Sequence, residues 1–480
     1  MELHEHNCLQ RVNHLPLELL SHMFVLCDAS TDYKDEEQAP RSYIQCVAPA
    51  VCRHWRNVAL ASTALWTTIR IMQPVPCKRT ALYLNRSGST ALLDIKIVIF
   101  SPQSPGKGEK LENLRNYSER VRKTFAFIVK HGGSSSRWRS LCFGTDIFAS
   151  CSAAVDLLSK AGLSSLESLE IVFMGPWQGH PEDDKMFLDA YRGKSSSKLL
   201  FAEPPPQLGS VRLEGVINSH LFGDISRPQL AGLTDIYISF SGRHPGINHI
   251  HSMLAASPRL TKLCFNSGDT DPDEDGDTTT ANTSPSSKIT LTHLQSLNFM
   301  HMINPVWNLS VVQMFKAPTL ENLELSFWID PDGSQLLVEY ISNQLTQSSP
   351  YFPATLNEIS FFTVMGGNPD PEPLLRAYPN ITTLKAGSIT ALLKRPWLVP
   401  NLVNLEAIIY DTSELKNLVL GRCGDGLPLK TVEARWFGND GALSPDDRKQ
   451  IEKMVELTIW TRKPPTGDEG EDSGSQGQAE

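Results

Sequence analysis

A short hydrophobic phrase recurs along most of this 480-residue chain and restricts its fold more than any other feature. The phrase has the form apolar-x-x-apolar-x-apolar, as in Leu320, Leu323 and Leu325. Its last two apolar residues alternate with polar ones, which predicts a short strand with one buried face. The copies are Trp66/Ile69/Ile71, Leu92/Ile95/Ile97, Trp138/Leu141/Phe143, Leu166/Leu169/Ile171, Leu208/Val211/Leu213, Leu233/Ile236/Ile238, Leu260/Leu263/Phe265, Leu294/Leu297/Phe299, Leu320/Leu323/Leu325, Leu356/Ile359/Phe361, Ile381/Leu384/Ala386, Leu402/Leu405/Ala407 and Leu429/Val432/Ala434.

The spacing of the copies predicts a stack of strand–helix units. The separation in sequence between successive copies, such as those centred on Leu297 and Leu323, is mostly close to the repeat length of about 20–29 residues that is typical of leucine-rich repeats. Amphipathic segments of helical length lie between copies, at 111–131, 247–256, 309–317, 334–346 and 446–460. We therefore expect an α/β solenoid with parallel strands on its concave face and helices on its convex face.

The alternative is a doubly wound α/β sheet, whose buried strands are typically longer and more β-branched and are followed by glycine-rich turns. The short phrases here favour the solenoid. The repeats are irregular, because the asparagine that follows the phrase in regular leucine-rich repeats is missing.

The segment before the repeats is helical in pattern. Pro16 suits a first helical turn. Apolar residues recur around it at helical spacing, at Leu15, Leu19, Leu20, Met23, Phe24 and Leu26. A second amphipathic run covers 43–61 and leads to Leu65 and Trp66. A helical module of this size hides only part of its apolar surface by itself, so we expect a partner to cover the rest.

Three blocks of this segment resemble the F-box pattern, in the same order. They are Leu15-Pro16-x-Glu18-Leu19-Leu20, then Val51-Cys52-Arg53-x-Trp55, then Leu65-Trp66-x-x-Ile69. The closing Leu-Trp pair is similar to that of fungal F-box proteins with irregular leucine-rich repeats.

The resemblance implies a binding partner for the module. F-box helices dock on a Skp-type adaptor, which links them to a cullin, and apolar anchors in a groove would carry that contact. The residues that match the adaptor-contacting blocks are Leu15, Pro16, Leu19, Val51, Trp55, Leu65 and Trp66. The insert at 28–41 separates the first two blocks and is a departure that could occlude the groove.

The repeats would then bind a protein substrate on their concave face. Apolar phrase residues point into the stack, so the residues between and just beyond them point outward. Six of these outward residues belong to types that are enriched at interfaces, namely Tyr237, Met300, Trp328, Phe362, Tyr410 and Arg435. A one-residue error in phase would place them in the core instead.

Charge and hydropathy exclude several classes of function. The net charge of −9 is concentrated in an acidic segment at 269–277 and an acidic tail after 466. The sequence has no basic stripe, so nucleic-acid binding is not predicted. No apolar run is long enough to span a membrane, and the polar first ten residues are unlike a signal peptide. Nine scattered cysteines without a C-x-x-C pair favour buried thiols in a reducing compartment, and hence cytoplasmic or nuclear localisation.

No motif predicts catalysis, a cofactor or a metal site. The acidic loop begins like an EF-hand at Asp271, Asp273 and Asp275, but its twelfth position is Asn282. The pairs His4/His6 and His249/His251 lack a third ligand nearby in the sequence. None of the cysteines has a setting that would activate it as the nucleophile of a ubiquitin ligase.

The predicted organisation is an extension at 1–14, an F-box-like module at 15–71, a leucine-rich-repeat-like solenoid at 72–462 and a disordered acidic tail at 463–480. The solenoid contains an acidic loop at 269–288 that we expect to be disordered. The predicted function is a non-catalytic substrate receptor of a cullin-RING (SCF-type) ubiquitin ligase. The alternative is a leucine-rich-repeat scaffold with no ubiquitin-ligase role.

Overall fold

The structure is a computed structural model of the whole chain. It describes residues 10–29, 44–72, 75–100, 114–174, 185–189, 199–242, 244–270, 288–328, 331–343, 349–363, 369–436 and 443–461. Most of the predicted insert, nearly all of the acidic loop and the whole acidic tail lie outside these residues, and so do His4 and His6.

The chain divides into two compact units, one of residues 1–260 with 269–285 and one of residues 261–268 with 286–480. The first unit holds parallel strands in the order β1 (Thr68–Ile71), β2 (Leu93–Ile99), β3 (Trp138–Thr145), β4 (Ser168–Phe173), β5 (Ser210–Ile217) and β6 (Asp235–Gly242). The second holds β7 (Lys262–Thr270), β9 (Ser296–Met302), β11 (Asn322–Phe327), β12 (Glu358–Thr363), β13 (Thr383–Ala386), β14 (Asn404–Ile409), β15 (Thr431–Trp436) and β16 (Glu456–Thr461).

The last two apolar residues of every copy of the hydrophobic phrase lie on one of these strands, and the middle residues of the copies pair with one another. In the second unit Leu297 is in register with Leu323, Leu323 with Ile359, and Ile359 with Leu384. The first unit shows the same alignment, for example between Leu141 and Leu169. The predicted parallel α/β arrangement of short strands is therefore confirmed within each unit.

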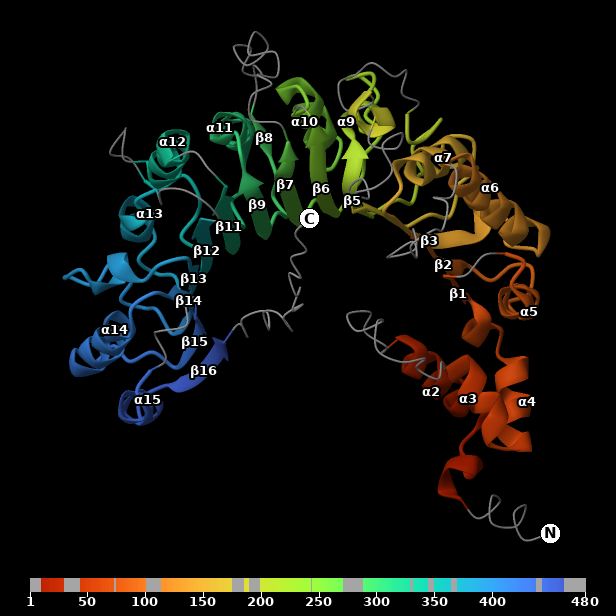
Figure 1. Cartoon of the computed structure of the whole chain (residues 1–480), viewed down its shortest axis with the longest axis horizontal. Helices are drawn as coiled ribbons and strands as arrows, with labels where there is room; N and C mark the ends of the chain where they lie inside the picture. The colour runs from red at the N-terminus through yellow and green to blue at the C-terminus, as the bar shows by residue number, and fades with distance from the viewer. Residues whose placement is uncertain are drawn as a thin grey trace, which may run out of the picture. The chain divides into compact units, whose positions relative to one another are not determined.

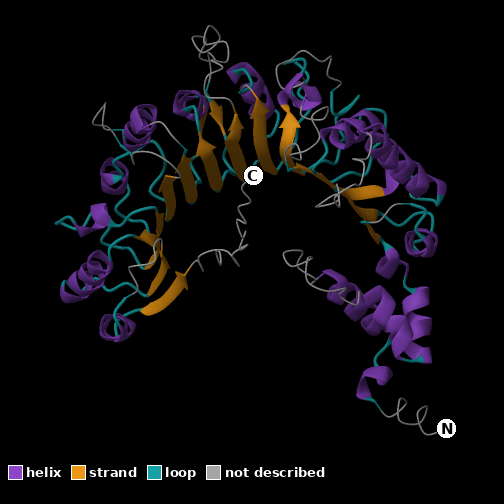
Figure 2. Cartoon of the chain, viewed as in Figure 1, coloured by secondary structure: helices purple, strands orange, loops and turns teal. Residues whose placement is uncertain are grey.

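Helices follow the strands and cover one face of the sheet in each unit (Figure 1). In the first unit these are α5 (Lys78–Arg86), α6 (Leu114–Lys130), α7 (Phe148–Leu158), α9 (Asn218–Leu221) and α10 (Ile247–Ala255). In the second they are α11 (Pro305–Gln313), α12 (Pro331–Ser342), α13 (Glu372–Ala377), α14 (Thr412–Gly424) and α15 (Pro445–Glu452). Among the described residues of the second unit, no helix covers the opposite face of the sheet (Figure 2).

The core of each unit lies between its helices and its strands. Phrase residues such as Leu323 and Leu325 are fully buried, as are Leu337, Val338 and Ile341 of α12. Burial of one such side chain contributes about 1.5–3 kcal/mol. Each repeat buries the apolar face of its neighbour, so we expect a single repeat to be unstable in isolation.

Two predicted helices are corrected by the structure. The segment 446–460 is not one helix, because α15 ends at Glu452 and β16 follows it, with Leu457 paired to Val432. The segment 309–317 begins too late: α11 starts at Pro305, where the side chain of Asn304 caps the helix by accepting from the Trp307 backbone N–H at 3.0 Å. Its end is a short strand, β10 (Phe315–Lys316), which pairs with β8 (Ile289–Thr290).

The N-terminal module consists of η1 (Arg11–His14), α2 (Leu17–Ala29), α3 (Ile44–Val51), α4 (Arg53–Ala61) and η3 (Thr63–Trp66). The predicted run 43–61 is thus two helices, because Cys52 is extended and its Sγ accepts from the Trp55 backbone N–H at 3.4 Å as an N-cap. The last predicted block of the module leads directly into β1, which pairs with β2.

Candidate functional site

The helices of the N-terminal module pack around a small aromatic cluster. Leu20 and Phe24 of α2 are buried, and the ring of Trp55 on α4 lies 5.0 Å from the ring of Phe24. The indole N–H of Trp55 donates to Asn13 Oδ1 at 2.7 Å. Trp55 is only partly exposed, so it helps to hold α2 and α4 together whatever else it contacts.

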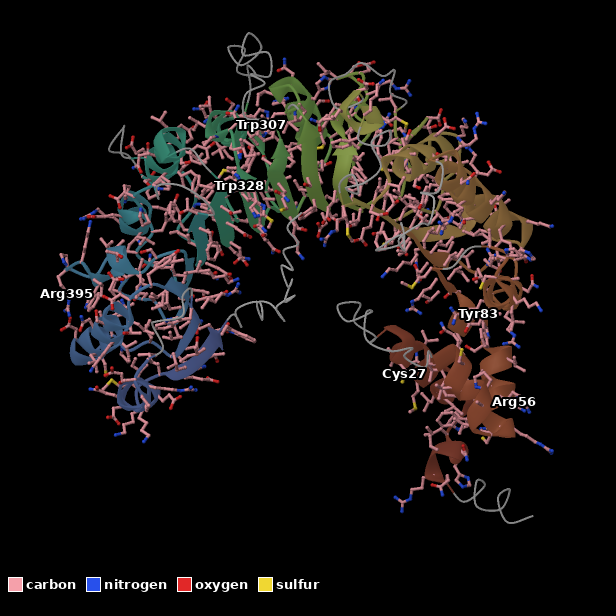
Figure 3. All side chains as sticks on the ribbon, viewed as in Figure 1. Cys27, Arg56, Tyr83, Trp307, Trp328 and Arg395 are labelled. Carbon is pink, nitrogen blue, oxygen red and sulfur yellow. The ribbon has the colours of Figure 1, made fainter. Side chains whose placement is uncertain are left out.

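The closing block of the module is buried. Leu65 is 1% exposed and Trp66 is 0% exposed. The indole N–H of Trp66 donates to the carbonyl of Ala59 at 2.8 Å, and its ring lies 5.1 Å from that of Tyr83 on α5 (labelled in Figure 3). Leu65 and Trp66, which are predicted to contact an adaptor, thus join the module to the first repeat in this structure.

An apolar stripe remains exposed on α2. Leu19 is 53% exposed, Met23 43% and Leu26 54%. These residues lie at i, i+4 and i+7, so they share one face of the helix. Leu15, which is partly buried, and Pro16, which is exposed, directly precede α2. Exposed leucines are ordinary when scattered, but an aligned stripe of them is typical of a contact surface.

The predicted adaptor-contacting residues therefore fall into two groups. Leu19 and Val51 are exposed, the latter at 50%, whereas Leu65 and Trp66 are core residues. Sequence matching missed the exposed Leu26, and also Leu60 of α4, which is 42% exposed. The helical spacing gave the signal for Leu26, but spacing alone does not show which edge of a broad apolar face packs inward.

The second candidate surface is, within each unit taken separately, the helix-free face of its strands, opposite the face that the helices cover. The six predicted substrate-contacting residues all have exposed surface: Tyr410 and Arg435 are exposed, and Tyr237, Met300, Trp328 and Phe362 are partly exposed. Buried phrase residues such as Ile236, Phe299 and Phe361 lie next to them along the strands. Ser239 and Ser360, which the predicted phase places on this face, are nevertheless buried, at 3% and 6% exposed, and so is Ser326, at 6%. It lies where β9 and β11 change register.

That change of register is a bulge in β9 that sequence analysis missed. His301 has a left-handed backbone conformation with φ of 49°. Its Nδ1 lies 3.1 Å from Asn266 Oδ1, and its ring meets the ring of Trp328 edge to face at 5.5 Å. The bulge thus fixes the indole of Trp328, which follows β11 directly and is labelled in Figure 3.

Ion pairs between neighbouring strands run across the same face of the second unit. Lys385 on β13 pairs with Glu358 on β12 at 2.7 Å, and Arg435 on β15 pairs with Glu406 on β14. The hydrogen bond to Glu358 raises the pKa of Lys385. Burial raises the pKa of the Glu324 carboxyl. The nearby charge of Lys385 partly offsets this rise, and the charge of Glu358 adds to it.

The raised pKa of Glu324 predicts a pH-dependent effect of its replacement by Gln. A carboxyl with a raised folded-state pKa is penalised when ionised, so the variant is expected to be more stable than wild type at pH 7, by up to about 1 kcal/mol. The gain should disappear as pH falls below about 4.5, where the carboxyl is protonated in both states. Urea denaturation at both pH values measures it. A gain that persists at low pH would show that charge is not the cause.

The described residues hold potential metal ligands only singly or in pairs. They contain no group of three or more His, Cys, Asp and Glu side chains arranged to hold a metal ion. His249 lies on α10 against the ring of Phe222, and burial lowers its pKa. None of the described helices is both long and apolar enough to cross a lipid bilayer.

Comparison with known proteins assigns no family. No family model matches the chain, and no curated protein has a sequence that matches it.

Proposed function

We propose that this protein is the substrate-recognition subunit of a cullin-RING (SCF-type) ubiquitin ligase that acts in the cytoplasm or nucleus. The observation that carries the proposal is the exposed stripe of Leu19, Met23 and Leu26 on a helix whose other face packs within the module. In this proposal the stripe binds a groove of a Skp-type adaptor, and the adaptor connects the protein to a cullin.

The order of the three sequence blocks supports the proposal further. Leu15 and Pro16 directly precede α2, Trp55 lies in the second block against that helix, and the Leu65-Trp66 pair joins the module to the repeats. The helix-free face of the strands would hold a protein substrate. The module would contribute proximity, because it raises the effective concentration of substrate lysines near the ubiquitin donor.

Co-purification with a Skp-type adaptor tests this function. Tagged full-length protein is expected to retain the adaptor, and through it the cullin, as efficiently as an established F-box protein does in the same assay. Failure to retain the adaptor would refute the proposal. Retention of the adaptor without the cullin would favour the alternative of a leucine-rich-repeat scaffold with no ubiquitin-ligase role.

A further inference from the structure

The helix-free face of β11–β16 carries an excess of carboxylates. The outward positions of these strands include two cations, Lys385 and Arg435, whose ion pairs neutralise Glu358 and Glu406. Three further carboxylates on the face have no ion pair among the described residues, namely Glu324, Glu433 and Glu456. Glu433 and Glu456 are exposed and Glu324 is partly exposed.

The corresponding face of the first unit has no such excess. Arg139 pairs there with Asp94 across neighbouring strands, and Arg212 pairs with both Glu170 and Glu214. Asp94, Glu170, Glu214 and Asp235 stand against Arg70, Lys96, Arg139 and Arg212 on β1–β6. The same strand architecture therefore has balanced charges in one unit and unmatched carboxylates in the other, so the excess is a property of β11–β16 and not of the repeat.

The register of the strands gives the spread of the unmatched carboxylates. Glu324 aligns with Ser360, Ser360 with Lys385, Lys385 with Glu406, and Glu406 with Glu433. Glu324 and Glu433 are thus four strands apart, or about 19 Å at the usual spacing between strands. An extended peptide of about six residues covers that distance.

Aromatic side chains lie on the same face. Trp460 on β16 is 59% exposed and is in register with Arg435, and Phe362 on β12 is partly exposed. Lysine and arginine combine a cationic head with an apolar stem, so they suit a surface that carries both carboxylates and aromatic rings. An acidic segment would instead meet like charges on this face.

We infer that the face of β11–β16 binds an extended, Lys/Arg-rich segment of a partner protein, with its cations at Glu324, Glu433 and Glu456. This inference deepens the proposed function, since it names the class of substrate segment that the receptor would recognise. The binding itself does not depend on the adaptor.

Fluorescence anisotropy with the full-length protein tests the inference. The probe is a fluorescein-labelled peptide of alternating Arg and Ser, and a peptide of alternating Glu and Ser is the sign control. The triple variant Glu324→Gln, Glu433→Gln, Glu456→Gln removes the unmatched carboxylates. The matched variant Glu119→Gln, Asp156→Asn, Glu452→Gln changes the net charge equally, on α6, α7 and α15.

The basic probe is expected to bind wild type with an affinity that falls as salt rises, and to bind the triple variant about tenfold or more weakly. The matched variant should bind like wild type, and circular dichroism should show that both variants are folded. Equal loss in both variants, equal binding of the acidic probe, or no binding of the basic probe would each overturn the inference. Adaptor capture by the triple variant should be unchanged. Loss of adaptor capture would therefore count against the ligase function, and loss of peptide binding against this inference.

Discussion

Replacing Arg422 with Met is expected to lower the free energy of unfolding of the second unit by about 2–4 kcal/mol. Arg422 lies in the last turn of α14 and is only 1% exposed. Its guanidinium donates to the backbone carbonyls of Val399, Pro400 and Leu402 at 3.0–3.2 Å, and so ties the helix to the loop that precedes β14. Methionine fills much of the same volume but leaves these buried acceptors unpaired.

A nearby arginine provides the matched control. Arg395 is largely exposed, stacks on the ring of Trp397 at 3.9 Å and pairs with Asp425. Arg395→Met removes the same charge from the same part of the sheet, but exposed ion pairs contribute only about 0–1 kcal/mol. Urea denaturation of both variants measures the difference. If Arg422→Met were no less stable than Arg395→Met, the hydrogen bonds of the buried guanidinium would not be what stabilises the loop before β14.

The strand arrangement could be predicted from the sequence because each strand repeats the same pattern. A phrase such as Leu402/Leu405/Ala407 fixes both where the strand lies and which of its residues point inward, and a shift by one residue would expose every apolar side chain. For this reason the register among Leu384, Leu405 and Val432 was predictable to the residue. The last strand was missed because Ile451, Val455 and Ile459 are spaced as on a helix, although Val455, Leu457 and Ile459 also alternate as in a strand.

Contacts that stabilise the loops of individual repeats were not predictable from the sequence. Regular leucine-rich repeats carry an asparagine after the phrase, and this chain instead satisfies some loop carbonyls with buried arginines. Arg137 donates to the carbonyls of Ala91 and Gly132 at 2.8 and 2.6 Å, much as Arg422 does in the second unit. Burial lowers the pKa of both guanidinium groups. In the sequence these arginines look like any surface cation, because their burial depends on loops from other repeats.

The candidate adaptor surface was predictable only in part, for a related reason. The pattern that marks Leu65 and Trp66 as F-box-like is also the pattern of core residues, and both are buried. Trp55 packs against Phe24, so Trp55→Ala would weaken the module as well as any contact. A sharper test needs residues whose exposure is equal and whose positions on the helix differ.

Leu19→Glu and Leu26→Glu are each expected to weaken adaptor binding by about thirtyfold or more. A charge at the centre of an apolar contact commonly costs about 2 kcal/mol or more, and each 1.4 kcal/mol is a factor of ten. Glutamate is a good helix former, and both leucines are more than half exposed, so α2 itself should remain folded. Titration of purified adaptor in a calorimeter, with circular dichroism of each variant, measures both effects.

Leu17→Glu is the control for these variants, because Leu17 lies on the same helix and is 55% exposed, against 53% for Leu19 and 54% for Leu26. Two residues along a helix correspond to a rotation of about 200°, which places Leu17 on the side away from the stripe. It should therefore bind the adaptor as wild type does. If Leu17→Glu weakened binding as much as Leu19→Glu, the contact would not be confined to the Leu19, Met23 and Leu26 stripe. If only the two stripe variants lost binding, the effect would follow the face of α2 and could not be ascribed to added charge or to loss of helix stability.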